Sequence, residues 1–366
     1  MKISHPAIPF GSTVVVIGAN GFIALETCQK LLDVGYRVRG TVRDVARERD
    51  WMHALFGTAM FELVQVPDFE ADTAFDAAFQ GSPTTGAAGV IYVSTPVVFD
   101  TDPAKVISPT VNGTIQTLEA AARAGVKCYV LAGSSKAIVT TTYDTPFSLS
   151  TKMYNYESIA DSLSPPVGES PFARSLNLYS AARTLAELAF WSWVAKNKPP
   201  FTANSVVPDG NFGRMLANKD SDASTKSTLG ALKGALAGQW DAAPLKIGTV
   251  HSLQEDLVMV LIRDFLAYYI DVQDIARLLV AGVALTSIAN ERILAYNRQA
   301  SWNPLRQDVR EIRPDLVTGD DEDVTGMDIS DAHEDIQRAE EILREVGQPG
   351  FTGKNDMLRD FINTVY

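Results

Sequence analysis

The chain has 366 residues, of which 46% are hydrophobic and 21% are charged, and its formal net charge is −12. This composition is typical of a globular protein with a sizeable buried core, and it excludes an intrinsically disordered chain. The acidic balance argues against a nucleic-acid-binding protein, which needs a basic face.

Cysteines and histidines are few and scattered. The two cysteines, Cys28 and Cys128, cannot form a disulfide framework and fit a reducing compartment. The four histidines have no metal-like spacing, so we expect no metal site. The first residues lack the apolar core of a signal peptide, and the most apolar stretch, 257–270, is too short to span a bilayer. We therefore expect a cytoplasmic protein without membrane or nucleic-acid partners.

Strand and helix patterns alternate over residues 1–208. Thr13–Ile17 is a β-branched run, typical of a strand buried on both faces. Apolar residues at helical spacing follow from 22 to 32, and Gly35 ends that helix. Further strand patterns cover 36–43, 61–66, 89–95, 127–135 and 202–208, and helix patterns cover 72–81, 110–124 and a stretch that opens at 177. The alternation predicts an α/β fold with a doubly wound parallel sheet.

Beyond residue 208 the patterns are less regular. Helices are predicted at 271–283, 330–347 and 355–365, and the acidic stretch 319–328 is predicted to be a solvated loop. We predict a smaller substrate-binding region over 209–366. It is interleaved with the first region, because a segment of about 268–300 returns to the sheet.

A glycine-rich turn follows the first strand. Gly18, Gly21 and Ala24 stand three residues apart where the strand becomes a helix. Small residues there let the backbone approach a pyrophosphate, and the helix N-terminus supplies N–H groups and a positive dipole end. The pattern predicts a dinucleotide site, with a plain turn as the alternative.

The end of the second strand indicates which dinucleotide binds. An NAD site usually has an acid about twenty residues after the glycines, whereas this chain has Arg39 and Arg43 and no acid before Asp44. Two guanidinium groups suit a 2′-phosphate, so we predict NADPH (NADP) in preference to NADH. Solvated arginines at a strand end are the alternative.

Tyr179 and Arg183 lie four residues apart in a helix pattern, so they share one face. A cation beside a phenol favours the phenolate, which makes the tyrosine a useful proton donor near neutral pH. Such pairs are also common on ordinary helices. Ser134 ends an earlier strand and follows the same cofactor-type turn, and this context favours a catalytic role for Tyr179.

Five stretches, "GANGFIA", "VRGTVRD", "YVLAGSS", "YSAARTLAE" and "DVQDIAR", occur in an order that resembles the extended short-chain dehydrogenase/reductase family. The chain is most similar to the dihydroflavonol-reductase-like branch of microbial aldehyde and ketone reductases. The resemblance implies a Rossmann-type sheet, a nicotinamide cofactor and a Ser-Tyr-Lys catalytic group. It implies catalytic roles for Ser134 (with Ser135 as the other candidate), Tyr179 and Arg183. The expected cofactor-binding residues are Gly18, Asn20, Gly21, Phe22, Ile23, Arg39, Arg43, Asp68, Val93, Ser94, Thr95, Tyr179, Arg183 and Pro208.

The chain departs from the family pattern in four places. Arg183 stands where the family has lysine, and arginine stays protonated, so it cannot pass a proton in a relay. Ile17 and the "LAGSS" stretch depart from the usual motifs. Residues 247–266 look inserted, either as a lid or as sequence that the family does not need.

These features predict an NADPH-dependent reductase of an aldehyde or ketone, with secondary metabolism as one setting. The alternatives are a changed chemistry (isomerase, cyclase or lyase) and a weakly active or non-catalytic nucleotide-binding protein. Aromatic residues between 141 and 171 either line a pocket for a bulky substrate or belong to the core. A small carbonyl compound is the expected partner, and the protein is expected to be a monomer or homodimer.

Overall fold

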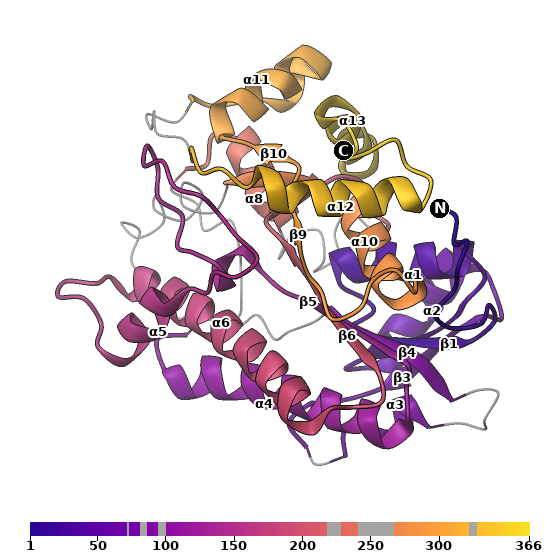
Figure 1. Cartoon of the computed structure of the whole chain (residues 1–366). Coiled ribbons are helices and arrows are strands. Elements are labelled where there is room, and N and C mark those ends of the chain that lie inside the picture. Colours follow the sequence, from indigo (N-terminus) through magenta and orange to yellow (C-terminus); the bar gives the residue numbers. More distant parts are fainter. Residues whose placement is uncertain (72, 81–85, 94–99, 218–227, 241–266, 322–327) are drawn as a thin grey trace.

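The structure of the protein is a computed structural model that describes residues 1–71, 73–80, 86–93, 100–217, 228–240, 267–321 and 328–366 (Figure 1). Ser94, Thr95 and the apparent insertion 247–266 lie outside the described residues. The described residues form a sheet of seven strands and a sheet of three, with helices around both.

The large sheet is parallel and has the strand order β3-β2-β1-β4-β5-β6-β9. Its strands are β1 (Thr13–Ile17), β2 (Arg37–Val42), β3 (Phe61–Gln65), β4 (Ala87–Tyr92), β5 (Cys128–Ala132), β6 (Thr202–Pro208) and β9 (Arg292–Ala295). The order reverses between β1 and β4, and ligands of such sheets bind at this point, beyond the carboxyl ends of the strands. The doubly wound α/β fold predicted from the sequence is confirmed.

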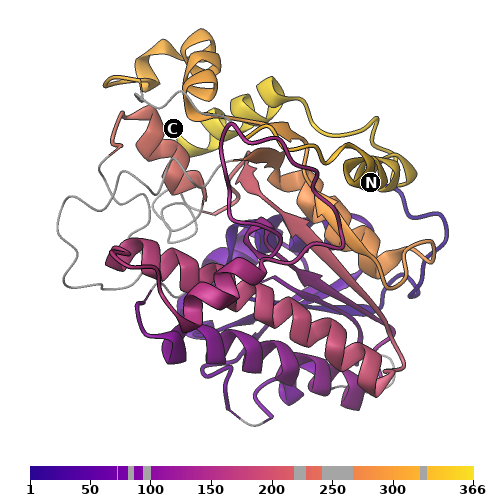
Figure 2. The same ribbon diagram turned by 60° about the vertical axis from the view of Figure 1, so that its left-hand side comes forward.

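Helices cover both faces of the large sheet (Figure 2). One layer contains α1 (Phe22–Asp33), α2 (Val45–Phe56) and α10 (Val272–Ala284), and the other contains α3 (Asp76–Phe79), α4 (Pro103–Ala124) and α6 (Pro171–Asn197). Val14 and Val16 of β1 pack into the first layer, whereas Val15 and Ile17 pack into the second. The β-branched run is therefore buried on both faces, as its sequence predicted.

Two helices start earlier than their sequence pattern predicted. The α4 helix begins at Pro103 instead of residue 110, because Asp102 caps it by accepting a hydrogen bond from the N–H of Ala104. The α6 helix begins at Pro171 instead of residue 177, with Ser170 as its cap. In both helices a polar cap precedes a proline at the first helical position. The earlier start places Tyr179 in the third turn of α6 rather than at its head.

The small sheet has the order β10-β8-β7 and joins strands from distant parts of the chain. Its strands are β7 (Gly210–Phe212), β8 (Tyr268–Asp271) and β10 (Arg298–Gln299), and α8 (Thr228–Leu236), α11 (Trp302–Ile312), α12 (His333–Glu345) and α13 (Lys354–Val365) lie around it. The α10 helix packs on the large sheet and β9 joins it beside β6. The division of the chain at residue 208 stays a prediction.

Candidate active site

The glycine turn after β1 is held by Thr41 at the end of β2. Gly18 has a φ of +78°, and its N–H donates to Thr41 Oγ1 at 3.1 Å. The N–H of Ala19 donates to the carbonyl of Thr41 at 2.9 Å, and the N–H of Gly21 donates to the carbonyl of Gly18 at 3.1 Å. A side chain at residue 18 would be strained, because this conformation favours glycine. Thr41 was not among the predicted site residues.

The N-terminus of α1 follows this turn directly. Gly21 is the N-cap residue, and no acidic side chain lies in the first helical turn. The backbone amides of Asn20, Gly21, Phe22 and Ile23 therefore lie at the positive end of the helix dipole, at the sheet's switch point. This arrangement fits the pyrophosphate of a dinucleotide.

Arg39 has a different place from the one predicted for a phosphate ligand. Its side chain is buried in the middle of β2, and its Nε donates to Glu62 Oε1 at 2.6 Å. Its Nη1 donates to the carbonyls of Ala78 and Gln80 at 3.0 and 2.7 Å. These contacts give Arg39 a structural role in joining β2 to β3 and to the end of α3. Its service as a phosphate ligand stays a prediction, although these bonds already engage its Nε and Nη1.

Arg43 is exposed and follows the last residue of β2. Asp44, the acid that follows it, is used to cap α2, because its Oδ1 accepts the N–H groups of Ala46 and Arg47. Of the two predicted arginines, Arg43 is the one that the structure leaves at the strand end. A 2′-phosphate there would meet a guanidinium group and a carboxylate that is already bound to backbone amides.

The other predicted cofactor residues follow the carboxyl ends of three strands of the same sheet. Asp68 is exposed after β3, Val93 is half-buried after β4, and Pro208 is buried at the end of β6. Asp68 Oδ1 accepts the N–H of Glu70 at 2.9 Å, which fixes its turn. Because these strands are parallel, all three residues lie on the edge where the glycine turn lies.

Arg183 joins α6 to the end of β5. It is 9% exposed, and its Nη2 donates to the carbonyls of Ala132 and Gly133, both at 2.7 Å. These carbonyls belong to the two residues that precede Ser134. The predicted catalytic arginine therefore lies beside the predicted catalytic serine's turn.

Tyr179 lies beyond the end of β5, on the side of Ser134. The α6 helix runs antiparallel to the strands, because it leads back to β6, which is parallel to β5. Tyr179 is four residues before Arg183, or about 6 Å further toward the carboxyl edge. The α6 helix also packs against η1 (Ser135–Ala137), the short helical turn that Ser134 caps. Arg183 and the turn of Ser134 thus meet at one corner, and Tyr179 stands one helical turn before Arg183 on the same helix.

The two adjacent serines have different hydrogen bonds. Ser134 is half-buried, and its Oγ accepts the N–H of Lys136 at 3.3 Å. Ser135 donates its hydroxyl proton to Asp209 Oδ1 at 2.6 Å. Within the described residues the proton of Ser134 is used in no hydrogen bond, so it can be donated to a carbonyl oxygen.

Gly133 accounts for the unusual "LAGSS" stretch. A Cβ at this position would lie 2.9 Å from Val207 Cγ2 on the neighbouring strand. The N–H of Gly133 donates to the carbonyl of Val206 at 2.7 Å, so the chain stays close to β6 beyond the end of β5. A larger residue would push the serine turn away from β6.

One helical turn after Arg183, a buried ion pair joins α6 to β9. Glu187 binds Arg292 through both carboxylate oxygens at 2.9 and 2.8 Å and accepts the hydroxyl of Ser205 at 2.7 Å. Arg292 Nη1 also donates to the carbonyls of Thr151 and Met153. Sequence analysis missed this pair. The spacing of Tyr179, Arg183 and Glu187 on one helix face was the available signal.

The segment 141–171 is fastened to the protein rather than loosely looped. The Arg292 guanidinium stacks over the Tyr154 ring at 4.2 Å, and burial raises the pKa of Tyr154. Phe147 and Met153 pack on a buried cluster that includes Tyr268 and Tyr296. For these two residues the structure favours the core alternative, while a substrate-lining role for the segment stays a prediction.

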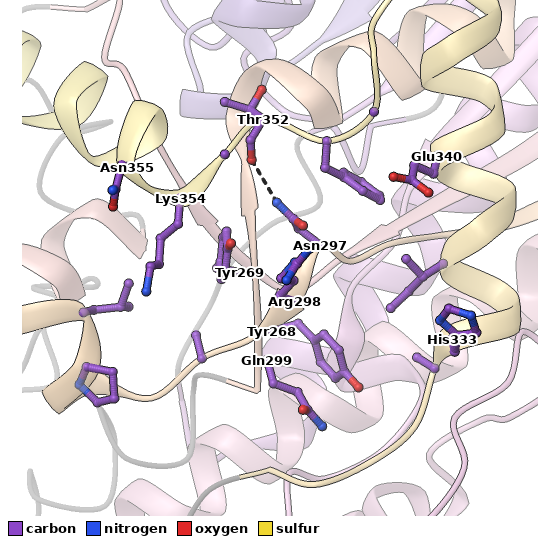
Figure 3. A pocket seen from close by; sticks show the side chains of 18 of the residues that line it. Tyr268, Tyr269, Asn297, Arg298, Gln299, His333, Glu340, Thr352, Lys354 and Asn355 are labelled. Atoms are coloured by element: carbon purple, nitrogen blue, oxygen red, sulfur yellow. Dashed lines mark hydrogen bonds between the residues drawn. The ribbon is translucent and has the colours of Figure 1, made fainter. Parts of the chain in front are cut away.

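A pocket of about 1100 Å³ lies elsewhere, between the small sheet, α12 and the segment before α13 (Figure 3). None of the predicted site residues lines it. Three hydrogen bonds join groups of its lining: Tyr268 Oη and Gln299 Nε2 donate to the carbonyl of Ser330, and Asn297 Nδ2 donates to that of Thr352. These bonds hold the pocket's walls together. Because the predicted site residues lie outside this pocket, the candidate active site is the one at the carboxyl edge of the large sheet.

Metal-binding clusters and membrane-spanning helices are both missing from the described residues. The part of the chain that the structure describes has no group of three or more His, Cys, Asp or Glu side chains arranged to hold a metal ion. Among the same residues, no helix has the length and apolar character needed to cross a bilayer.

Comparisons with known proteins give consistent results. The model of the NAD dependent epimerase/dehydratase family matches residues 14–284. Aldehyde reductase 2 of Sporidiobolus salmonicolor is 30% identical over 369 residues, covering 99% of this chain and 98% of that protein. Ketoreductase adrE of Penicillium roqueforti is 31% identical over 357 residues and 94% of each chain. The structure of Gre2 from Candida albicans in complex with NADPH has a TM-score of 0.75 at 23% identity, covering 98% of each chain, which shows a shared fold.

The family match includes the glycine turn, the serine turn, α6 and the start of the small sheet. The resemblance drawn from five short motifs is therefore confirmed. This chain belongs to the NAD-dependent epimerase/dehydratase family, the extended branch of the short-chain dehydrogenases/reductases, and it is an oxidoreductase.

Proposed function

We propose that the protein reduces an aldehyde or ketone to an alcohol with NADPH, and that Ser134, Tyr179 and Arg183 carry the reaction. The pair of bonds from Arg183 to the carbonyls of Ala132 and Gly133 supports this most directly, because it brings α6 to the serine turn. Relatives named aldehyde reductase and ketoreductase support the same class of reaction.

Each residue has a separate task. Ser134 donates a hydrogen bond to the carbonyl oxygen and polarises it, and Tyr179 donates the proton that the oxygen takes up. A bound NADPH would supply the hydride to the carbonyl carbon. Arg183 holds the serine turn against α6 and places a positive charge beside the phenol.

The cofactor would be held by residues at the carboxyl edge of the large sheet. The amides of Asn20, Phe22 and Ile23 would hold the pyrophosphate, with Gly21 letting the backbone approach it closely, and Arg43 would hold the 2′-phosphate. Asp68 would lie at the adenine, and Val93 and Pro208 would lie at the nicotinamide end. The same assignment for Ser94 and Thr95 rests on their sequence position alone.

Arg183 limits how the proton of Tyr179 is replaced. A lysine can pass a proton, whereas a guanidinium group stays charged. Both hydrogens of Nη2 are already directed to backbone carbonyls. Tyr179 must then be reprotonated by another route, and the loss of a relay step costs on the order of 10²–10⁴-fold in rate.

The test is NADPH oxidation with a panel of activated aldehydes and ketones. Tyr179→Phe should lower kcat at least about 100-fold, because it removes the proton donor. Tyr156→Phe, which changes an exposed tyrosine on the neighbouring α5 helix (Tyr156–Leu163), is the matched control and should keep full activity. Full turnover in Tyr179→Phe would refute the assignment.

A changed chemistry is the second candidate, and the fixed guanidinium group of Arg183 favours it. An isomerase, cyclase or lyase would form product without net consumption of NADPH. Arg183→Lys separates the candidates, because it restores the usual relay residue. A rise in carbonyl reduction indicates a reductase limited by its arginine, and cofactor binding without turnover in both proteins indicates a nucleotide-binding protein.

A further inference from the structure

Asp209 lies where the large sheet leads into the small one. It follows Pro208, the last residue of β6, and precedes β7, and its side chain is 8% exposed. Its Oδ1 accepts the hydroxyl proton of Ser135 at 2.6 Å. Its Oδ2 accepts the N–H groups of Tyr268 and Ala267 at 2.6 and 3.2 Å. One carboxylate thus binds both the serine turn after β5 and the start of β8.

The bond to Asp209 distinguishes the two adjacent serines. A serine has a single hydroxyl proton, and the half-buried Ser135 donates it to the buried carboxylate of Asp209. Ser135 then has no proton for a carbonyl oxygen, while the hydroxyl of Ser134 accepts a bond and keeps its own proton.

The serine turn also supplies a positive charge near the Asp209 carboxylate. Burial raises the pKa of the Asp209 carboxyl, and the nearby ammonium group of Lys136 lowers it. Lys136 is 5% exposed, and its Nζ donates to Thr141 Oγ1 at 2.6 Å. Ser135 and Lys136 therefore supply a proton donor and a counter-charge to one buried carboxylate.

We propose that Asp209 is a positioning residue of the carbonyl reduction: by binding Ser135 it fixes the serine turn and presents Ser134 to the substrate. Asp209 itself does not touch the substrate. The proposal rests on the proposed function. It goes further because it names the residue that engages Ser135 and leaves Ser134 to bind the substrate, and because that residue is also bound to the start of the small sheet's β8.

The test compares kcat, KM and the dissociation constant of NADPH in five variants. Ser134→Ala should lower kcat about 100-fold, as for loss of a donor to a developing oxyanion. Ser135→Ala and Asp209→Ala should each lower kcat about tenfold, the value of one such hydrogen bond. In the Asp209→Ala background, Ser135→Ala should cost less than about twofold, because the bond it removes is already lost. Asp209→Asn should restore kcat to within about threefold, since an amide can bond to Ser135 and to the two backbone N–H groups.

The dissociation constant of NADPH should stay within about twofold in all five variants, because none of the changed side chains is among the predicted cofactor-binding residues. Ser162→Ala, which removes a buried hydroxyl from α5, is the control and should leave kcat unchanged. If Asp209→Ala does not fold, the test uses Ser135→Ala, Asp209→Asn and the double variant of these two. The kcat of the double variant should then equal that of Ser135→Ala.

Three results separate the possible failures. An inactive wild-type protein with every carbonyl would refute the proposed function itself. An active wild type in which Ser135→Ala is the severely impaired variant would reverse the roles of the serines and overturn the proposal alone. Additive losses in the double variant would also overturn it, because Asp209 would then act independently of Ser135.

Discussion

The glycine turn after β1 and the corner between β5, α6 and β6 are held together in different ways. The turn depends on backbone bonds and small residues, such as the contact of Gly18 with Thr41. The corner depends on buried charged groups from segments far apart, such as Glu187 with Arg292 and Ser135 with Asp209. The nucleotide end is therefore sensitive to the size of a side chain, and the chemical end is sensitive to the balance of charge.

The largest expected effect comes from breaking the ion pair of the corner. Glu187→Ala leaves the guanidinium group of Arg292 buried without its carboxylate, since the Arg292 side chain is 6% exposed. We expect the free energy of unfolding to fall by about 3–5 kcal/mol. Urea denaturation measures the loss.

The matched control uses a more exposed ion pair. Glu291→Ala removes the carboxylate of the Arg338–Glu291 pair, whose side chains are 35% and 29% exposed, and should cost about 0–1 kcal/mol. Similar losses in the two variants would show that burial does not distinguish these pairs.

Asp271 is a buried carboxyl group whose pKa makes the stability of the protein depend on pH. It caps α10 through Oδ1, which accepts the N–H of Gln273, while Oδ2 is buried and accepts no hydrogen bond from the residues that the structure describes. Burial and the nearby Asp274 raise the pKa of Asp271 to about 7. The folded protein then keeps a proton on Asp271 that the unfolded chain releases near pH 4.

The stability from that proton is complete below about pH 4 and is lost as the pH rises through about 7. Over about 3 pH units this amounts to at most about 4 kcal/mol. Asp271→Asn keeps the cap and cannot ionise, so its free energy of unfolding should fall less between pH 5 and pH 8 than that of the wild type. Asp102→Asn, the same exchange at the exposed cap of α4, is the control. Parallel pH curves for the wild type and Asp271→Asn would contradict the prediction.

A smaller effect is expected when the glycine turn is crowded. A Cβ on Gly40 would lie 2.6 Å from the Cβ of Ala19, so Gly40→Ala should cost about 1–3 kcal/mol of unfolding free energy. It should also weaken NADPH binding, because Ala19 belongs to the turn. Adding Ala19→Gly removes the opposing methyl group and should recover both properties. NADPH fluorescence titration that shows unchanged affinity in Gly40→Ala would disprove the expected link.

The smallest effect separates Arg39 of β2 from Arg43, which follows that strand. Arg43→Ala should raise the dissociation constant of NADPH about tenfold and leave that of NADH unchanged, as for one bond to a charged group. Arg39→Ala should lower stability and leave the ratio of the two constants unchanged, because its guanidinium group is bound to Glu62 and two carbonyls. A changed ratio in Arg39→Ala would restore the first interpretation of that residue.

Much of the fold could be predicted from short stretches. The β-branched run Thr13–Ile17 forms a strand buried on both faces, and Gly18 adopts a positive φ at the strand's end. The sequence pattern placed the starts of α4 and α6 several residues beyond Pro103 and Pro171, where these helices begin. Asp102 and Ser170 cap them through hydrogen bonds to backbone N–H groups, which the apolar pattern does not include. Local patterns therefore predicted which elements form better than where they begin.

The sequence by itself determined the βαβ unit, the glycine turn and the family, because each depends on the spacing of residues within a few turns of chain. Only the tertiary structure decided that Arg39 is bound inside the sheet while Arg43 is exposed, and that Ser135 is bound to Asp209 while Ser134 is not. Those outcomes depend on single contacts with residues 23 to 74 positions away, and such contacts leave no periodic trace in a single sequence.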